Sequence, residues 1–245
     1  LQALPSIVPN FWLGNALTVP VHHDHPYNLA CVVGGRRRFT LFAPTQVGNL
    51  YIGPLEHTPS GAPISVVHPK PPDLERYPRY REALASALVA ELEPGDALYM
   101  PPLWFHQVEA LAPVNLLVNY WWPVAGDPAL PSPAATLMQA IQVLNALPPA
   151  QRDAWAAMYG HYVVQREQEP GAHIPEAWQG ALARRRWRRG HAADEGGGRH
   201  HARALRARSG AGLRTCGPAR RGGELAAGGA GQGGPGGLFA VPDGL

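Results

Sequence analysis

The chain has 245 residues, 45% of them hydrophobic, and a formal net charge of +3. This length allows one large β-rich domain, or one domain with an extension. Residues 1–180 hold 9 Lys and Arg against 14 Asp and Glu, whereas residues 181–245 hold 12 Arg against 4 acidic residues. The basic balance therefore belongs to the end of the chain and gives no evidence that the folded part binds nucleic acid.

The two cysteines and the apolar runs limit the cellular setting. Cys31 lies in an apolar run and Cys216 in a Gly-rich one, so a structural disulfide is not expected. No apolar run reaches the roughly 18 residues of a membrane span, and no signal-peptide pattern opens the chain. We therefore expect no membrane partner, and we predict a reducing cytoplasm as the location.

Short apolar runs separated by turn residues dominate residues 5–124. Gly34-Gly35 is a hairpin signal between two such runs, and Pro94-Gly95-Asp96 is a turn signal before a third. Strands this short and this regularly punctuated predict two packed sheets of the jelly-roll kind. The runs that we predict as strands are 7–14, 28–33, 39–42, 97–100 and 114–122.

Two segments between these runs differ from them in composition. Residues 46–73 are rich in Gly and Pro, which predicts a long loop. Residues 80–92 have a helical composition, with Leu84 and Leu88 one turn apart, so we expect a helix there.

After residue 124 the pattern becomes helical. Ser132-Pro133 is an N-cap and first-turn pair, and Leu137, Ile141 and Leu144 follow at helical spacing. A second helix follows the break at Pro148-Pro149. We therefore predict a helical extension over 125–181. Its apolar helices either pack on the chain's own sandwich or form a homodimer through residues 133–165.

Residues 182–245 do not resemble a packed domain. They hold 17 of the 28 glycines together with many Arg and Ala residues, a composition that cannot bury enough apolar surface to offset the entropy of ordering. We predict a disordered tail. It is either a frameshifted read-through of a GC-rich gene or a native basic tail.

Three residues in the strand-rich part form a candidate metal site. His22 and Asp24 are two residues apart, and His106 follows 82 residues after Asp24. Residues 22 and 24 of an extended strand project to the same side, so one segment can supply two ligands and a partner strand the third. Two imidazoles and one carboxylate are the facial triad that holds Fe(II) and leaves positions open for a cosubstrate and O2.

The residues around this triad resemble the cupin-like JmjC hydroxylases, the family of the asparaginyl hydroxylase that inhibits hypoxia-inducible factor. The resemblance implies a double-stranded β-helix, a jelly-roll or cupin fold, that holds Fe(II) and 2-oxoglutarate. Such a domain would span residues 1–124. Relatives carry further residues upstream of the first strand, and we expect this chain to lack that part. The matching stretches are 20–29, 35–44, 93–109 and 118–122.

The resemblance also assigns roles around the metal. It places His22, Asp24 and His106 on the iron. It places Arg37 where relatives pair a Lys or Arg with the far carboxylate of 2-oxoglutarate. Asn28 and Asn119 fall on inward-facing polar positions near the cosubstrate.

Other interpretations of these three polar residues stay open. The run Arg36-Arg37-Arg38 is also typical of a solvated turn, although strand alternation lets Arg37 face away from its two neighbours. Asn28 and Asn119 can alternatively cap backbone groups.

Two further residues complete the predicted cosubstrate site. Thr18 adjoins Val19, which stands where relatives have a hydrogen-bonding Thr, and Tyr99 is expected to line the same cavity.

The sequence thus predicts an Fe(II)- and 2-oxoglutarate-dependent dioxygenase, a hydroxylase that uses O2. Its substrate is a protein or peptide side chain, or a small molecule. Two alternatives remain: a non-catalytic cupin-fold binding or scaffold protein, and a metal cupin that acts without 2-oxoglutarate.

Overall fold

The computed structural model describes residues 7, 9–56, 58, 61–124, 130–164, 169–183, 203–206 and 214–215. Two compact units divide the chain. The first comprises residues 1–124 and 199–245, and the second comprises residues 125–198. We call them the sandwich unit and the helical unit.

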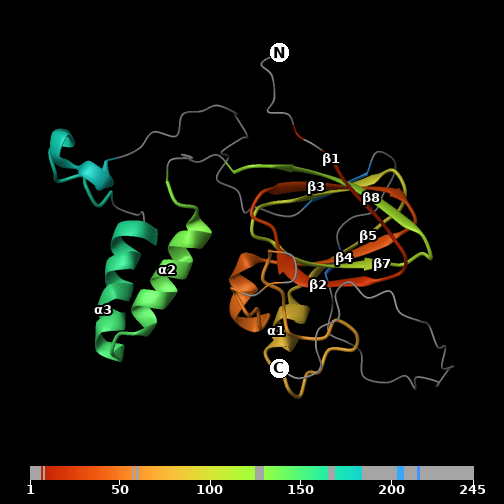
Figure 1. Cartoon of the computed structure of the whole chain (residues 1–245), viewed down its shortest axis with the longest axis horizontal. Helices are drawn as coiled ribbons and strands as arrows, with labels where there is room; N and C mark the ends of the chain where they lie inside the picture. Colours follow the sequence, from red (N-terminus) through yellow and green to blue (C-terminus); the bar gives the residue numbers. More distant parts are fainter. Residues whose placement is uncertain are drawn as a thin grey trace, which may run out of the picture. The chain divides into compact units, whose positions relative to one another are not determined.

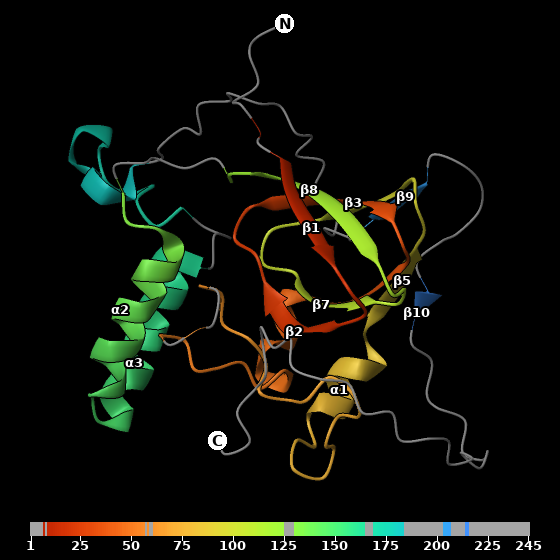
Figure 2. The same cartoon turned by 45° about the vertical axis from the view of Figure 1, so that its right-hand side comes forward.

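Two antiparallel sheets form the sandwich unit, and they face each other in Figures 1 and 2. The first sheet has the order β1-β8-β3-β6-β9 and the second β10-β5-β4-β7-β2. The chain passes repeatedly from one sheet to the other, as in a jelly roll, so the predicted double-stranded β-helix fold is confirmed. The strands are β1 (Pro9–Gly14), β2 (Thr18–His23), β3 (Tyr27–Gly34), β4 (Arg37–Phe42), β5 (Leu88–Leu92), β6 (Asp96–Met100), β7 (Phe105–Ala110), β8 (Asn115–Trp122), β9 (Arg203–Arg206) and β10 (Arg214–Thr215).

Side-chain alternation along the strands builds the interior between the sheets. In β3 every second residue is buried from Asn28 to Val32, and β6 shows the same period from Asp96 to Met100. The inward side chains of both sheets form one apolar cluster, which burial from water stabilises. Its members are Ala30, Val32, Phe39, Leu41, Ala90, Leu92, Leu98, Met100, Trp104, Val108 and Leu117.

A second apolar cluster lies beside β2 and β7 and fixes the segment between β4 and β5. The 3-10 helix η1 (Pro44–Asn49) opens this segment, and the short helix α1 (Tyr80–Ala85) closes it. The predicted helix over 80–92 is correct only for its first half. From Leu88 the chain pairs with β4 as β5, because this places Ala90 and Leu92 in the core. The second cluster consists of Val21, Phe42, Leu50, Val67, Tyr80, Ala83, Ala87 and Phe105.

The turn at Gly34-Gly35 is not the predicted hairpin. β3 pairs with β6 and β8, whereas β4 pairs with β5 and β7, so the turn carries the chain from one sheet to the other. Gly35 has a φ of +76°, and a Cβ there would collide with the side chain of Asn115. The glycine signal therefore marks a tight crossing that other residues cannot make without strain.

The helical unit contains α2 (Pro133–Asn145) and α3 (Pro149–Tyr159), followed by the π-helical turn η2 (Gly160–Val164). Two 3-10 turns follow, η3 (Glu176–Trp178) and η4 (Gly180–Leu182). The Ser132 side chain accepts a hydrogen bond from the backbone N–H of Ala135 at 3.1 Å, which is the predicted N-cap. Among the described helices, none is long and apolar enough to cross a membrane.

Both long helices of this unit expose large apolar side chains. Val143 of α2 is 63% exposed, and Trp155 of α3 is 49% exposed. Exposed apolar side chains at helical spacing are typical of a contact surface. The homodimer through residues 133–165 stays a prediction.

Two short strands lie within the segment that the sequence predicts to be disordered. β9 pairs with β6, and β10 pairs with β5, so each extends the edge of one sheet. These two short segments are strands in the structure, and the disorder of the tail as a whole stays a prediction. The rest of 184–245 lies outside the described residues.

Glu109 is a buried carboxylate on the outer side of β7. Its carboxylate forms ion pairs with Arg38, at 3.3 Å, and with Lys70, and it accepts a hydrogen bond from Gln107 at 3.1 Å. The Lys70 contact ties the long segment between β4 and β5 to the strand that carries His106. Loss of the negative charge removes both ion pairs at once.

Glu109→Gln is therefore expected to lower the free energy of unfolding by about 1–2 kcal/mol, because charge-assisted hydrogen bonds to a buried group are lost. Glu91→Gln is the matched control, since Glu91 also pairs with Arg38 but is 46% exposed. Glu91→Gln is expected to lower the free energy of unfolding by less than about 0.5 kcal/mol, as for other surface ion pairs. Urea unfolding measures both, and an equal loss in the two variants would contradict this role of Glu109.

Candidate metal centre

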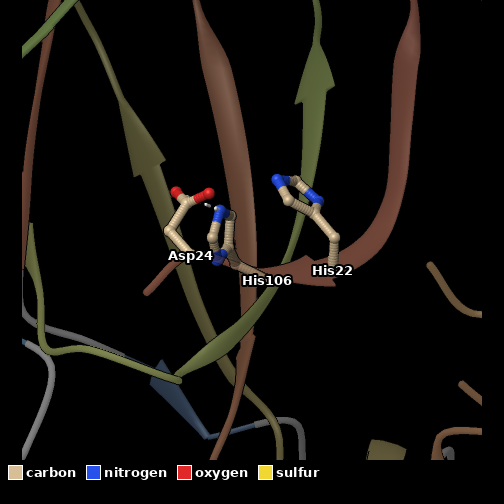
Figure 3. Close-up of side chains that lie close together, drawn as sticks. All are labelled: His22, Asp24 and His106. Atoms are coloured by element: carbon tan, nitrogen blue, oxygen red, sulfur yellow. Dashed lines mark ion pairs between the residues drawn. The ribbon is translucent and has the colours of Figure 1, made fainter. Parts of the chain in front are cut away.

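The structure brings the three predicted ligands together. His22 lies on β2 directly opposite His106 of β7, and Asp24 follows just after β2 ends. One ligand atom from each residue lies within 4.8 Å of the other two. Figure 3 shows the two imidazoles and the carboxylate converging on one point. The cluster is mostly shielded from water, since the side chains of His106 and Asp24 are 5% and 20% exposed.

Hydrogen bonds fix which nitrogen each imidazole offers. Nδ1 of His22 lies 2.8 Å from the carbonyl oxygen of Pro20, and Nδ1 of His106 lies 3.0 Å from that of Trp104. A carbonyl only accepts, so Nδ1 carries the proton in the neutral form of each ring, and Nε2 is then the nitrogen that can bind a metal. This is the arrangement in which outer hydrogen bonds orient metal-binding histidines.

The electrostatics of the cluster also favour a cation. Burial, and then the neighbouring His22, lower the pKa of His106 to about 4, so its ring is neutral at pH 7. Its Nε2 lies 3.6 Å from Oδ2 of Asp24, beyond hydrogen-bond distance. This contact, the dashed line in Figure 3, is an ion pair only when His106 is protonated, and the neutral ring leaves both groups able to share a metal ion. Two nitrogen ligands and one carboxylate oxygen suit Fe(II).

Asn28 and Asn119 both lie in the interior beside the carboxylate. Asn28 donates a hydrogen bond from Nδ2 to Oδ2 of Asp24 at 3.1 Å, and Asn119 donates from Nδ2 to Oδ1 of Asn28 at 3.3 Å. Both side chains are buried, at 3% and 4% exposure. They bond to other side chains, so the alternative that they cap backbone groups does not describe them.

Arg37 and Arg38 lie on opposite faces of β4. Arg38 faces outward to Glu91 and Glu109, whereas Arg37 is buried on the same face as Phe39 and Leu41. Burial lowers the pKa of the Arg37 guanidinium. It donates one hydrogen bond, from Nη2 to the carbonyl oxygen of Trp12 at 3.2 Å.

The hydrogen-bonding capacity of Arg37 is largely unused. Its Nε has no partner, and it forms no ion pair among the residues that the structure describes. An uncompensated buried cation is costly, so this position favours an anionic ligand.

Thr18 and Tyr99 do not lie at the predicted site. Thr18 is paired with Glu109, whose carboxylate faces outward, and it is Val19 that packs against the core. Tyr99 alternates with the inward-facing Leu98 and Met100, and therefore points to the opposite face. There it stacks with Tyr27 and Trp122, with ring centroids 6.3 and 6.1 Å away.

One residue beside the site was missed by the sequence analysis. Trp12 of β1 donates a hydrogen bond from its indole N–H to Oδ1 of Asn119 at 2.7 Å, and its carbonyl accepts from Arg37. Trp12 is 47% exposed, and it reaches the interior through its indole N–H. The apolar run around it reads as an ordinary strand, and nothing in that run indicates this contact.

The fold and this cluster together define a double-stranded β-helix with a candidate metal centre in its interior. Residues 5–127 match the family model described as "Cupin-like domain". The chain belongs to the cupin-like domain family.

Proteins named for the Jumonji C domain are among its relatives. Jumonji C domain-containing protein 5 of Drosophila melanogaster is 41% identical over 112 residues, which cover 45% of this chain and 26% of that protein. Lysine-specific demethylase JMJ31 of Arabidopsis thaliana is 36% identical over 122 residues, which cover 49% of this chain and 21% of that protein. The human bifunctional peptidase and (3S)-lysyl hydroxylase JMJD7 is 34% identical over 146 residues, which cover 52% of this chain and 45% of that protein. The chain spans less than half the length of each.

The buried neutral state of His106 predicts a pH-dependent stability of the metal-free protein. Unfolding restores the ordinary pKa of 6.5, so between pH 6.5 and about 4 the unfolded chain binds a proton that the folded chain does not. The free energy of unfolding should therefore fall as the pH drops through this window, and His106 should not change it above the window. Urea unfolding across this range should show a shallower fall in His106→Gln, and the same fall in both proteins would contradict the assignment.

Proposed function

We propose that the protein is an Fe(II)- and 2-oxoglutarate-dependent oxygenase, a hydroxylase. The observation that carries the proposal is a half-buried to buried two-His-one-carboxylate cluster together with the buried guanidinium of Arg37, which has no acidic partner among the described residues. Neither feature contributes to the apolar core, and both face the same interior. Membership of the cupin-like domain family, with relatives named as a demethylase and a lysyl hydroxylase, supports this assignment.

His22, Asp24 and His106 would hold the iron. Their donor set fits Fe(II), because both imidazoles present Nε2 and one carboxylate balances part of the charge. With 2-oxoglutarate and O2, bound Fe(II) supplies the oxidising chemistry that converts a C–H bond to C–OH. The protein's own contribution would be to orient the substrate and to restrict water at this mostly shielded cluster.

Arg37 would hold the carboxylate of 2-oxoglutarate that is remote from the metal. Leu41 of β4 lies opposite His106, and Arg37 lies four residues further along the same inner face. Four residues of a strand span about 13 Å along the backbone. The long side chain of Arg37 can bring its guanidinium closer to the metal cluster than that. A guanidinium can form two parallel hydrogen bonds to a carboxylate, and the unpartnered Nε of Arg37 is such a donor.

We propose a protein or peptide side chain as the substrate, on the strength of two relatives whose names specify lysine. A small molecule is the second candidate. A reducing cytoplasm, which would keep the iron ferrous, is our proposal for the location.

Calorimetric titration of the Mn(II)-loaded protein with 2-oxoglutarate tests the cosubstrate site. Arg37→Gln should weaken binding by about tenfold or more, because a charge-assisted interaction is lost. Arg38→Gln is the matched control, since Arg38 is adjacent but faces outward, and it should bind as the wild type does. A wild-type protein that binds Mn(II) but not 2-oxoglutarate would contradict the proposal and favour a metal cupin that works without this cosubstrate.

A further inference from the structure

A chain of side-chain hydrogen bonds crosses the interior of the first sheet and ends on the metal-binding carboxylate. The indole N–H of Trp12 donates to Oδ1 of Asn119 at 2.7 Å. Asn119 donates to Asn28 at 3.3 Å, and Asn28 donates to Oδ2 of Asp24 at 3.1 Å. Three strands and the segment after β2 thus contribute one residue each.

The strand register explains how residues so distant in sequence meet. Asn119 of β8 lies opposite Asn10 of β1 and Ala30 of β3. Trp12 and Asn28 are each two residues away from these positions, so both are diagonal neighbours of Asn119 on the same face. Diagonal neighbours are within reach of long and aromatic side chains.

The direction of every bond in the chain follows from its two ends. An indole N–H can only donate, so Asn119 must present its oxygen to Trp12 and its amino group to Asn28. Asn28 must then present its oxygen to Asn119, which leaves its amino group for Asp24. An ionised carboxylate can only accept, so the far end fits the same direction. The tryptophan therefore fixes both amide orientations.

We infer that Trp12 is a positioning residue for the metal centre, acting on Asp24 through Asn119 and Asn28. The inference rests on the metal site proposed above. The terminal torsion of an aspartate is broad, so an unsupported carboxylate samples many orientations. The hydrogen bond from Asn28 restricts that rotation. The bonds from Trp12 to Asn119 and from Asn119 to Asn28 keep the amide of Asn28 from turning its oxygen toward the carboxylate.

This role differs from simple packing, because it depends on the N–H group and not on the ring. Trp12→Phe removes the donor and keeps an aromatic ring. Trp121→Phe is the matched control. Trp121 contacts Trp12 edge-to-face at 6.2 Å, but its own indole nitrogen is buried without a hydrogen-bond partner.

Co(II) titration of the metal-free protein, followed by the visible absorption of the bound ion, tests the inference without any turnover. Asn28→Ala should weaken Co(II) binding by about tenfold or more, as expected for an outer-shell partner of a metal ligand. Trp12→Phe should weaken it by about threefold, since its effect passes through two further bonds. Trp121→Phe should leave the affinity unchanged.

The double variant Trp12→Phe/Asn28→Ala separates positioning from a general loss of structure. If Trp12 acts through Asn28, then Trp12→Phe has no further effect once Asn28 is absent. Equal weakening by Trp12→Phe in both backgrounds, or none in the wild-type background, would overturn the inference. Thermal unfolding verifies that each variant is folded, and Asn119→Ser replaces Asn28→Ala in the cycle if the latter is unfolded.

His106→Ala distinguishes a failure of the metal site from a failure of the positioning role of Trp12. A wild type that binds Co(II) no better than His106→Ala would remove the metal site, and the positioning role with it. A wild type that binds Co(II) tightly while Trp12→Phe matches it would overturn the positioning role alone.

Discussion

The pairing of β2 with β7 is the constraint on which the site depends. This register places His22 opposite His106, while β4 on the other side of β7 places Leu41 opposite the same histidine. A shift of one residue would turn the ligands to the outer face. Core residues that alternate with the ligands, such as Val108, hold the register, because their burial is lost in any shifted arrangement. The apolar core therefore determines where the ligands point.

The interior of the sandwich carries several polar groups that a purely structural core would avoid. Burying an amide or a guanidinium without partners costs free energy. Asn28 and Asn119 meet this cost by bonding to each other, to Asp24 and to Trp12. Arg37 meets it only in part, through one backbone carbonyl. The hydrogen bonds of Asn28 and Asn119 are satisfied within the protein, which suits them to hold Asp24 in place. Arg37 has unused donors, which suits it to bind an anionic ligand.

Much of the site could be predicted from the sequence, because the relevant signals are local. The two-residue spacing of His22 and Asp24 is a property of one strand, and the inward orientation of Arg37 follows from simple alternation. Thr18 was named only because it adjoins the position of the relatives' Thr, and in the structure that position, Val19, packs against the core while Thr18 is paired with Glu109. Tyr99 lies on the strand before His106, but it alternates with the inward-facing Leu98 and Met100 and therefore points to the outer face of its sheet. Trp12 was missed because its role arises only from the pairing of β1 with β8. Leu88–Leu92 formed a strand despite a helical composition because the pairing with β4 outweighs local propensity.

The proposed oxygenase activity requires that one metal ion held by His22, Asp24 and His106 also binds 2-oxoglutarate. Anaerobic addition of Fe(II) and 2-oxoglutarate, followed by the weak visible charge-transfer absorption of the chelated complex, tests it most directly. We expect this band in the wild-type protein and its absence in a folded His106→Ala variant. A folded wild-type protein that binds iron and gives no band, or a band of equal strength in His106→Ala, would contradict it.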